Sequence, residues 1–420
     1  MVRIVTQLRQ HLKDPFYKNS YFLIGSAAAN SLLAVVFWIV VARFYPPGEV
    51  GLATALVSAI ALLGIFSKLG LDFGLIRFLP QADDKRGVIN SCFTIAGLFS
   101  LLLAIIFISG LDFWSPALLF VQENISILLL FIIFAPIYVL WMLQSTAFTG
   151  MRSAKFSFAT GIIASTLRIP LPILLVSLGA LGIFSSWGVG ICVALMASFF
   201  LFLPRLVPKY RPVPVIKKKV LNEMVHFSTG NYVAEIFLSS PAMLLPLIIV
   251  NVLSAEMSAF FYMAYAVARV LFMIPIAITS SLLAEGSYEP DKFRKNVIRA
   301  IKFSFIFITP AILGIFILGD KLLLLFGSEY SQSALKMLWL LALSGIPFII
   351  TRVYVTIKRI QLKIRPIIAV YALTAICTLV LSVSLMPSMG LLGIGIAWIS
   401  TQGIMGAVLV LLIMKKEKWV

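Results

Sequence analysis

An arginine stands in the middle of a long apolar run, "YMAYAVARVLFMIPIAI", which covers residues 262–278. The guanidinium of Arg269 cannot be deprotonated in a protein. Arg269 lies about eleven residues into the predicted span 258–284, which is about 16 Å along a helix axis. A lipid-facing arginine at that depth costs about 2.5 kcal/mol or more, so we expect a hydrated or paired interior around it.

A second arginine has a similar setting in the first half of the chain. Arg168, in "ASTLRIPLPILLV", lies near the middle of the predicted span 156–178. Arginine suits phosphate because its planar fork can form two parallel, charge-assisted hydrogen bonds. Each half of the chain therefore supplies one deep cation, and both could line a cavity that holds an anionic group.

A salt bridge inside the membrane is the alternative explanation for these cations. Glu235, in "NYVAEIFLSSPAM", is the one carboxylate that falls clearly inside a predicted span, which makes it the best partner. We name Arg269, Arg168 and Glu235 as candidate substrate-binding residues of a central cavity. A purely structural ion pair remains open for either arginine.

The charges that follow the second predicted span are shallower. Lys68, Asp72 and Arg77 lie in the segment 66–80, which reads as a break followed by a short helix. We expect them to line a cytoplasmic entrance, and an interfacial salt bridge explains them equally well.

Arg352 and three prolines complete the set of unusual residues in apolar runs. Arg352 stands about two turns before the basic end of its span, so we expect its head group to snorkel to the interface. Pro170, Pro241 and Pro275 each remove a backbone hydrogen bond, and we expect helix kinks there.

The composition identifies the elements that must carry these residues. The chain has 420 residues, of which 61% are hydrophobic and 12% are charged, and the apolar residues form long stretches. Soluble domains are nearer half apolar and a quarter charged. The chain therefore reads as an all-α integral membrane protein. The net charge of +18 does not indicate nucleic-acid binding, because the basic residues cluster in short loops between apolar runs.

Motifs for enzyme chemistry are absent from the sequence. There is no phosphate-binding G-x-x-x-x-G-K-[ST] loop, no H-E-x-x-H and no G-x-S-x-G. The three cysteines stand alone in apolar stretches without metal-ligand spacing. We expect neither an enzyme nor a metal or cofactor site.

Hydropathy predicts about twelve spans in two sets of six. A basic, proline-rich segment, "RLVPKYRPVPVIKKK", separates the sets. We predict an N-terminal six-helix bundle at 1–204, a cytoplasmic linker at 205–220 and a C-terminal six-helix bundle at 221–420. The spans fall near 21–42, 50–66, 88–110, 125–144, 156–178, 181–203, 228–252, 258–284, 301–319, 333–357, 366–386 and 390–414.

The two sets also resemble each other. "YPPGEVGLATAL" (45–56) and "VLSAEMSAFFYM" (252–263) align with Glu49 on Glu256 and with small residues at matching positions. This favours two parallel repeats related by a pseudo-two-fold axis along the membrane normal.

Basic residues indicate the orientation of the chain. With a cytoplasmic N-terminus, the inside segments hold nearly all lysines and arginines, and the outside loops hold only Arg43, Lys321 and Lys336. The positive-inside rule then places both termini in the cytoplasm.

The segment Val40–Pro80 resembles the signature of polysaccharide-unit flippases in the multidrug/oligosaccharidyl-lipid/polysaccharide exporter (MOP) superfamily. The pattern is A-R-x-x-x-P-x-E-x-G, an apolar helix, and then L-G-L-x-x-x-L-x-R. The matching residues are Ala42, Arg43, Pro47, Glu49, Gly51, Leu69, Gly70, Leu71, Leu75 and Arg77.

The resemblance implies two six-helix bundles that form a V around a cationic central cavity. It also implies transport of polyprenyl-linked sugars across the cytoplasmic membrane. "AVARVLFMIP" is similar to a stretch of lipid II flippases in which an arginine faces the cavity six residues before a proline, here Arg269 and Pro275. The first-span Arg-Asp pair and two extra C-terminal helices of those flippases have no counterpart, which points away from lipid II itself.

These observations predict a flippase for polyprenyl-diphosphate-linked oligosaccharide or polysaccharide repeat units, working by alternating access. The partners are the lipid-linked glycan, the bilayer and a coupling ion such as H⁺ or Na⁺, without nucleic acid. We expect a monomer, with association to glycan-assembly proteins left open. A cation-coupled multidrug exporter of the same superfamily is the nearest alternative, and a membrane glycan polymerase or ligase is a more distant one.

Overall fold

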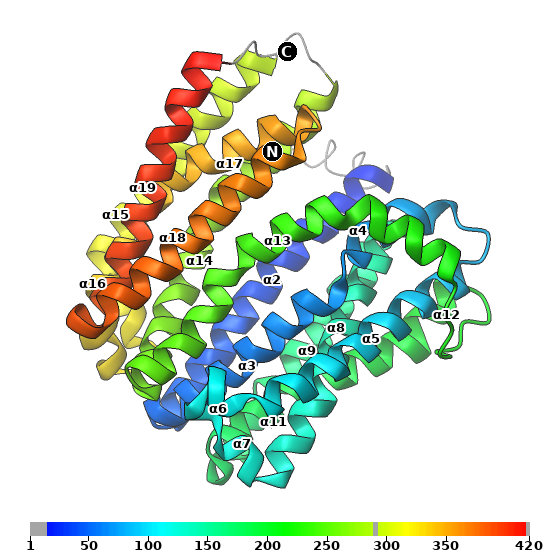
Figure 1. The fold of residues 1–420 in the computed structure, drawn as a ribbon, viewed down its shortest axis with the longest axis horizontal. Coiled ribbons are helices and arrows are strands. Elements are labelled where there is room, and N and C mark those ends of the chain that lie inside the picture. Colours follow the sequence, from blue (N-terminus) through cyan, green and yellow to red (C-terminus); the bar gives the residue numbers. More distant parts are fainter. Residues whose placement is uncertain (1–14, 289–292, 417–420) are drawn as a thin grey trace, which may run out of the picture. The chain divides into compact units, whose positions relative to one another are not determined.

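The computed structural model describes residues 15–288 and 293–416 of the chain. Within these ranges the chain is almost wholly helical and contains no strand (Figure 1). The predicted basic termini beyond them, with Arg3, Arg9 and Lys418, lie outside the described residues.

In the described part of the first half, from residue 15 onward, the chain forms eleven helices. Three single 3₁₀ turns (Leu79–Gln81, Pro116–Leu118 and Val176–Leu178) connect helices, and a π-helical turn (Ser198–Phe202) joins α11 to α12. The helices are α2 (Pro15–Phe44), α3 (Pro47–Lys68), α4 (Leu71–Phe78), α5 (Lys85–Ser109), α6 (Leu111–Trp114), α7 (Phe120–Glu123), α8 (Ile125–Gly150), α9 (Ala154–Arg168), α10 (Leu171–Leu174), α11 (Ala180–Ala197) and α12 (Leu203–Leu206).

In the second half, the described ranges contain seven helices. They are α13 (Lys218–Val252), α14 (Ala255–Tyr288), α15 (Phe293–Leu324), α16 (Ser328–Leu343), α17 (Gly345–Ile360), α18 (Ile364–Met389) and α19 (Leu391–Lys416).

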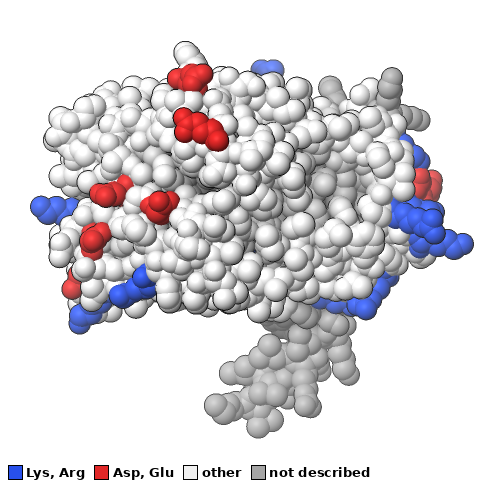
Figure 2. Space-filling view, turned by 90° about the horizontal axis from the view of Figure 1, so that it is seen from below, with Lys and Arg blue, Asp and Glu red and all other residues white. Residues whose placement is uncertain are grey.

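Eleven helical stretches in the described ranges are long and apolar enough to cross a membrane, and α2 adds the shorter apolar stretch Ala29–Phe44. The all-α membrane fold with about twelve spans is therefore confirmed, and the protein is a multi-pass membrane protein. In Figure 2, most of one face carries no charged side chain, as expected for surfaces that meet lipid.

The described residues form two compact units. The N-terminal unit comprises residues 1–45 and 56–232, and the C-terminal unit comprises 46–55 and 233–420. The helices α3 and α13 are each divided between the units. The bundle limits 1–204 and 221–420 stay a prediction about which parts fold together.

Each unit has its own helix packing and its own apolar core. In the N-terminal unit α5 packs on α8, α9 packs on α2 and α11, and α4 packs on α8. In the C-terminal unit α14 packs on α15, α16 and α17, while α19 packs on α16, α17 and α18 (Figure 1). A helix that is apolar on several faces is stable when those faces are covered by other helices or by lipid.

The break after the second span is a change of backbone conformation. Leu69 and Gly70 both have positive φ angles, 51° and 76°. A Cβ on Gly70 would lie 2.8 Å from Cβ of Ser228, so both the left-handed backbone and the close approach require glycine. The predicted break and short helix are confirmed as this turn and α4.

The predicted basic linker is folded onto α5. Residues 207–217 contain no helix, and they hydrogen-bond to one side of α5. Nδ2 of Asn90 donates to the carbonyl of Arg211 over 2.9 Å, and the amide of Lys217 donates to Ser91 over 3.0 Å. Lys217 also forms an ion pair with Asp84, the N-cap residue of α5.

Candidate functional site

Arg269 lies on the side of α14 that its packed neighbours do not cover. The buried residues of α14 recur every three or four positions, at Ala264, Ala268, Leu271, Pro275 and Thr279. Arg269 is about a third of a turn away from the centre of that stripe and is exposed. The helix therefore presents a permanent charge from within a membrane span.

Arg269 has no carboxylate partner in the described parts of the chain. It forms neither an ion pair nor a hydrogen bond there, so the predicted alternative of a pair with Glu235 is not realised. Its charge acts on the hydroxyl of Tyr265, one turn earlier. The Tyr265 ring packs on Phe261 and Trp398, with centroids 5.8 Å and 5.4 Å away. These aromatic contacts fix the position of the Tyr265 ring, which stands one helical turn before Arg269.

Arg168 is the last residue of α9 and belongs to the N-terminal unit. Its Nη2 donates to the hydroxyl of Ser165 over 3.2 Å. A cation in the last turn of a helix is also stabilised by the helix dipole. The apolar span continues only to Leu174, so Arg168 lies nearer to that end than the spacing of apolar residues predicts.

Glu235 is partly buried in the C-terminal unit, beside Ala234, which belongs to a core cluster with Tyr354 and Tyr371. The combination of Arg269, Arg168 and Glu235 in one cavity stays a prediction, because Arg168 belongs to a different unit from the other two.

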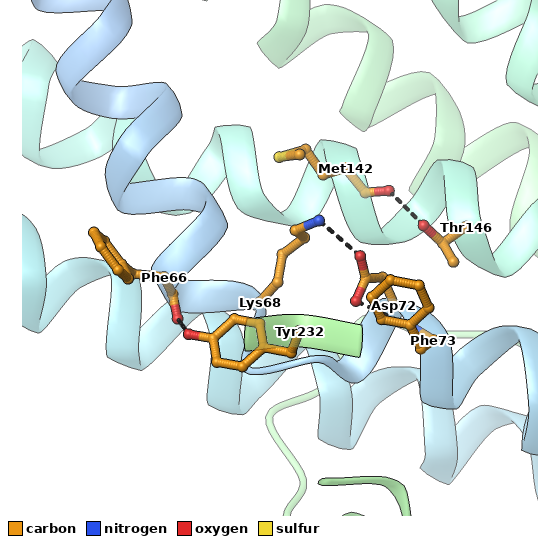
Figure 3. A network of polar contacts seen from close by, with 7 residues as sticks. All are labelled: Phe66, Lys68, Asp72, Phe73, Met142, Thr146 and Tyr232. Atoms are coloured by element: carbon orange, nitrogen blue, oxygen red, sulfur yellow. Dashed lines mark hydrogen bonds and ion pairs between the residues drawn. The ribbon is translucent and has the colours of Figure 1, made fainter. Parts of the chain in front are cut away.

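Lys68 and Asp72 form an ion pair across the α3–α4 break. Nζ of Lys68 lies 2.7 Å from Oδ2 of Asp72, and the side chains are 4% and 13% exposed (Figure 3). The other carboxylate oxygen accepts the amide of Phe73. The hydroxyl of Tyr232, from α13, donates to the carbonyl of Phe66 and ties α13 to the same break. The salt-bridge alternative therefore describes these two residues, and their role in an entrance stays a prediction.

Arg77 is not part of this ion pair. It is exposed at the end of α4, and its guanidinium lies 6.0 Å from the centroid of the Phe227 ring. That geometry is a weak cation–π contact.

The snorkelling predicted for Arg352 is wrong. Arg352 is only 8% exposed, and its Nη1 donates to the hydroxyl of Tyr371 over 3.2 Å. Tyr371 belongs to α18, and the spacing of residues within α17 does not predict this hydrogen bond. One signal in the sequence could have suggested the burial, since Arg352 is the one charged residue within 351–357.

The prolines differ in their effects on the helices. Pro170 follows the end of α9, where the helix is interrupted before α10. Pro241 and Pro275 lie inside the continuous helices α13 and α14. Oγ1 of Thr279 donates to the carbonyl of Pro275 over 2.7 Å. Kinks at Pro241 and Pro275 stay predictions.

The aligned repeat segments meet in the C-terminal unit. A Cβ on Gly51 would lie 1.7 Å from the carbonyl oxygen of Ala255, so the starts of α3 and α14 touch backbone to backbone. Glu49 and Glu256 stand in the first turns of these two helices, where the helix dipole favours acids. Sequence analysis found the repeated pattern but not this contact.

Metal chemistry has no candidate in the described ranges, where no three His, Cys, Asp or Glu side chains are grouped suitably for an ion. The candidate site consists of cationic side chains placed within apolar helices.

A family model for polysaccharide biosynthesis proteins matches residues 40–335 of the chain. The chain belongs to the polysaccharide biosynthesis protein family. The match begins with the segment that carries the flippase-like signature. No curated protein is similar enough in sequence to count as a match.

Several solved structures of transporters have a fold similar to that of this chain. The lipid II flippase MurJ, in an inward closed conformation, has a TM-score of 0.75 at 13% identity, covering 94% of this chain and 87% of its own. An inward-facing multidrug resistance MATE family transporter has a TM-score of 0.69 at 16% identity, covering 91% and 93%. A MOP superfamily transporter from Pyrococcus furiosus, described by the reverse polarity of its binding pocket, has a TM-score of 0.58 at 16% identity, covering 96% and 97%. These neighbours show that the chain shares its fold with transporters of the MOP superfamily.

Proposed function

We propose that this protein is a flippase that moves polyprenyl-diphosphate-linked oligosaccharide or polysaccharide repeat units across the cytoplasmic membrane by alternating access. The observation that carries the proposal is Arg269, a guanidinium inside a membrane span that is exposed and lacks an ion pair in the described residues. A charged side chain within a membrane span costs free energy, so such residues are rare and usually mark a functional site.

A diphosphate is the group that best fits this cation. The planar guanidinium can bind two phosphate oxygens at once, whereas sugars alone need no charged partner. Arg168 and Glu235 are proposed as further cavity residues, and Lys68, Asp72 and Arg77 as the entrance. The polyprenyl tail would stay in the lipid while the head group crosses.

The family description supports a role in polysaccharide assembly. MurJ shares the fold and carries a lipid-linked substrate according to its name, lipid II flippase. We propose that the chain itself performs no bond chemistry, that both termini are cytoplasmic, and that an ion gradient drives the cycle.

A multidrug exporter is the second candidate, and the MATE neighbours favour it. Binding of cationic drugs requires acidic residues at the site, whereas the spans here present arginines. The Pyrococcus furiosus transporter, with its reversed pocket polarity, is a precedent for different charge on one fold.

Reconstitution in liposomes tests the proposal. Movement of a fluorescent, diphosphate-linked glycolipid between leaflets is measured for wild type, Arg269→Ala and Arg269→Lys, with Lys336→Ala as the control for loss of an exposed cation. We expect Arg269→Ala to slow transport at least about tenfold, the worth of one charged hydrogen bond, with partial rescue by lysine.

Full transport by Arg269→Ala would contradict the role of Arg269. Export of a cationic drug by wild type, without movement of the glycolipid, would select the second candidate. Extension of the glycolipid instead of its movement would indicate a polymerase or ligase.

A further inference from the structure

A small cavity lies between α14 and α15, away from Arg269. Its volume is about 250 Å³, and it opens beside the end of α14 and the start of α15, two helices that pack on each other in the C-terminal unit (Figure 1). Ser281, Asn296 and Arg299 line one part, and Ile278, Phe303 and Phe307 line the other.

The polar side chains of the cavity have unused hydrogen-bonding groups. Asn296 is only 9% exposed and its amide makes no side-chain hydrogen bond in the described parts of the chain, whereas Ser281 is exposed at the rim of the cavity. Arg299 is exposed and forms no ion pair there. The amide of Asn296 and the guanidinium of Arg299 therefore stand on the wall of the cavity, where a polar ligand can reach both.

The order of side chains along α15 matches the order of groups in a lipid. Arg299 lies within about 10 Å of the start of the helix, and Phe303 and Phe307 follow one and two turns deeper. Both rings are exposed, 46% for Phe303 and 56% for Phe307, on a helix that crosses the membrane. A phospholipid with its phosphate at the polar end of the cavity would place its acyl chains against the two rings.

The charge of this region selects an anionic lipid. Arg294, Lys295 and Lys302 are also exposed on the first turns of α15, and none forms an ion pair in the described residues. Clustered basic residues at the end of a membrane helix attract anionic lipid head groups. The volume is below the about 300–1,000 Å³ of sites for drug-sized molecules, so it suits a single phosphate ester better than a glycan diphosphate.

We propose that this cavity binds the head group of an anionic glycerophospholipid from the surrounding bilayer. Arg299 and Asn296 contact the phosphate, Ser281 donates a further hydrogen bond, and Phe303 and Phe307 contact the acyl chains. The lipid would hold α14 against α15 at the opposite end of α14 from its contact with Gly51. The proposal is independent of the transported substrate.

Lipid retention by the purified full-length protein tests the proposal. Phosphatidylglycerol or phosphatidylcholine is added in detergent, and bound lipid is counted by native mass spectrometry, with thermal unfolding as a second readout. We expect wild type to retain phosphatidylglycerol about fivefold more strongly, and Arg299→Gln to reduce this to the level of phosphatidylcholine. Arg299→Lys should retain part of the preference.

Arg294→Gln is the matched control, because it removes the same charge from α15 outside the cavity. It should keep the preference for phosphatidylglycerol. An equal loss in Arg294→Gln and Arg299→Gln would overturn the proposal in favour of diffuse surface charge. Equal retention of both lipids by wild type would also overturn it, as would displacement of phosphatidylglycerol by a polyprenyl diphosphate in an Arg299-dependent way.

Discussion

In the N-terminal unit the buried ammonium of Lys68 lies 2.7 Å from the carboxylate of Asp72, whereas in the C-terminal unit the buried guanidinium of Arg352 bonds to the neutral hydroxyl of Tyr371. Two more exposed cations differ in another way. Arg168 bonds to Ser165 at a helix end, but Arg269 forms no bond in the described residues. Among the described residues, the C-terminal unit therefore holds two cations within its spans, Arg269 and Arg352, that form no ion pair with a carboxylate.

The difference separates structural charge from charge available to a ligand. A buried pair such as Lys68–Asp72 fixes the α3–α4 break and leaves little field for a substrate. An uncompensated cation contributes little to stability but attracts anions over several ångströms. Three variants, in addition to those at Arg269 and Arg299, would break or sharpen this contrast.

Lys68→Ala should have the largest effect on stability. It leaves the carboxylate of Asp72 buried without its partner, and breaking one side of a buried pair costs about 3–5 kcal/mol. Thermal unfolding in detergent measures the loss. The double variant Lys68→Met with Asp72→Leu should recover most of it, and a double variant as unstable as the single one would refute a simple pair.

Tyr371→Phe should have a smaller effect in the C-terminal unit. It removes the hydroxyl that accepts from Arg352, and an unsatisfied buried donor costs about 1–3 kcal/mol. Adding Arg352→Met should restore stability, because the charge is then gone as well. Unchanged unfolding of Tyr371→Phe would show that the hydroxyl does not stabilise the guanidinium.

Asp84→Asn should have the smallest effect. The hydrogen bond from Lys217 holds the pKa of Asp84 below its ordinary value of 3.8. A lowered folded-state pKa stabilises the structure above the unfolded value, and this is lost as pH falls through the folded one. Because both side chains are about half exposed, we expect at most about 1 kcal/mol.

Protease cleavage within residues 207–217 reports the attachment of this segment to α5. Cleavage should be faster for Asp84→Asn at neutral pH, and the wild type should approach the variant only below about pH 4. Identical cleavage at all pH values would mean that the hydrogen bonds between the side chains of Ser91 and Asn90 and the backbone of the segment are enough to hold it on α5.

The parts of the fold that depend on local patterns could be predicted from the sequence. Long apolar runs indicate the spans, and Gly70 between the charged residues Lys68 and Asp72 indicates the break that positive φ angles then produce. The spacing of Lys68 and Asp72, four residues apart, is compatible with an ion pair even though the chain turns between them.

Contacts between distant residues could not be predicted. The partner of Arg352 is a tyrosine on another helix, and apolar periodicity says nothing about which hydroxyl faces a cation. Asn296 and Ser281 look ordinary in sequence and gain meaning only when α14 and α15 enclose a cavity. Arg269 was found because a permanent charge in an apolar run is costly wherever its neighbours lie.

The junction of Gly51 and Ala255 has a consequence for inheritance. Main chain meets main chain there, so no change of rotamer can make room for a larger residue. Any replacement of Gly51 by another amino acid would force the starts of α3 and α14 apart by more than about an ångström. A related protein with a larger residue at this position must therefore hold the starts of the two helices further apart. The residue at position 51 thus indicates whether the close backbone contact is retained.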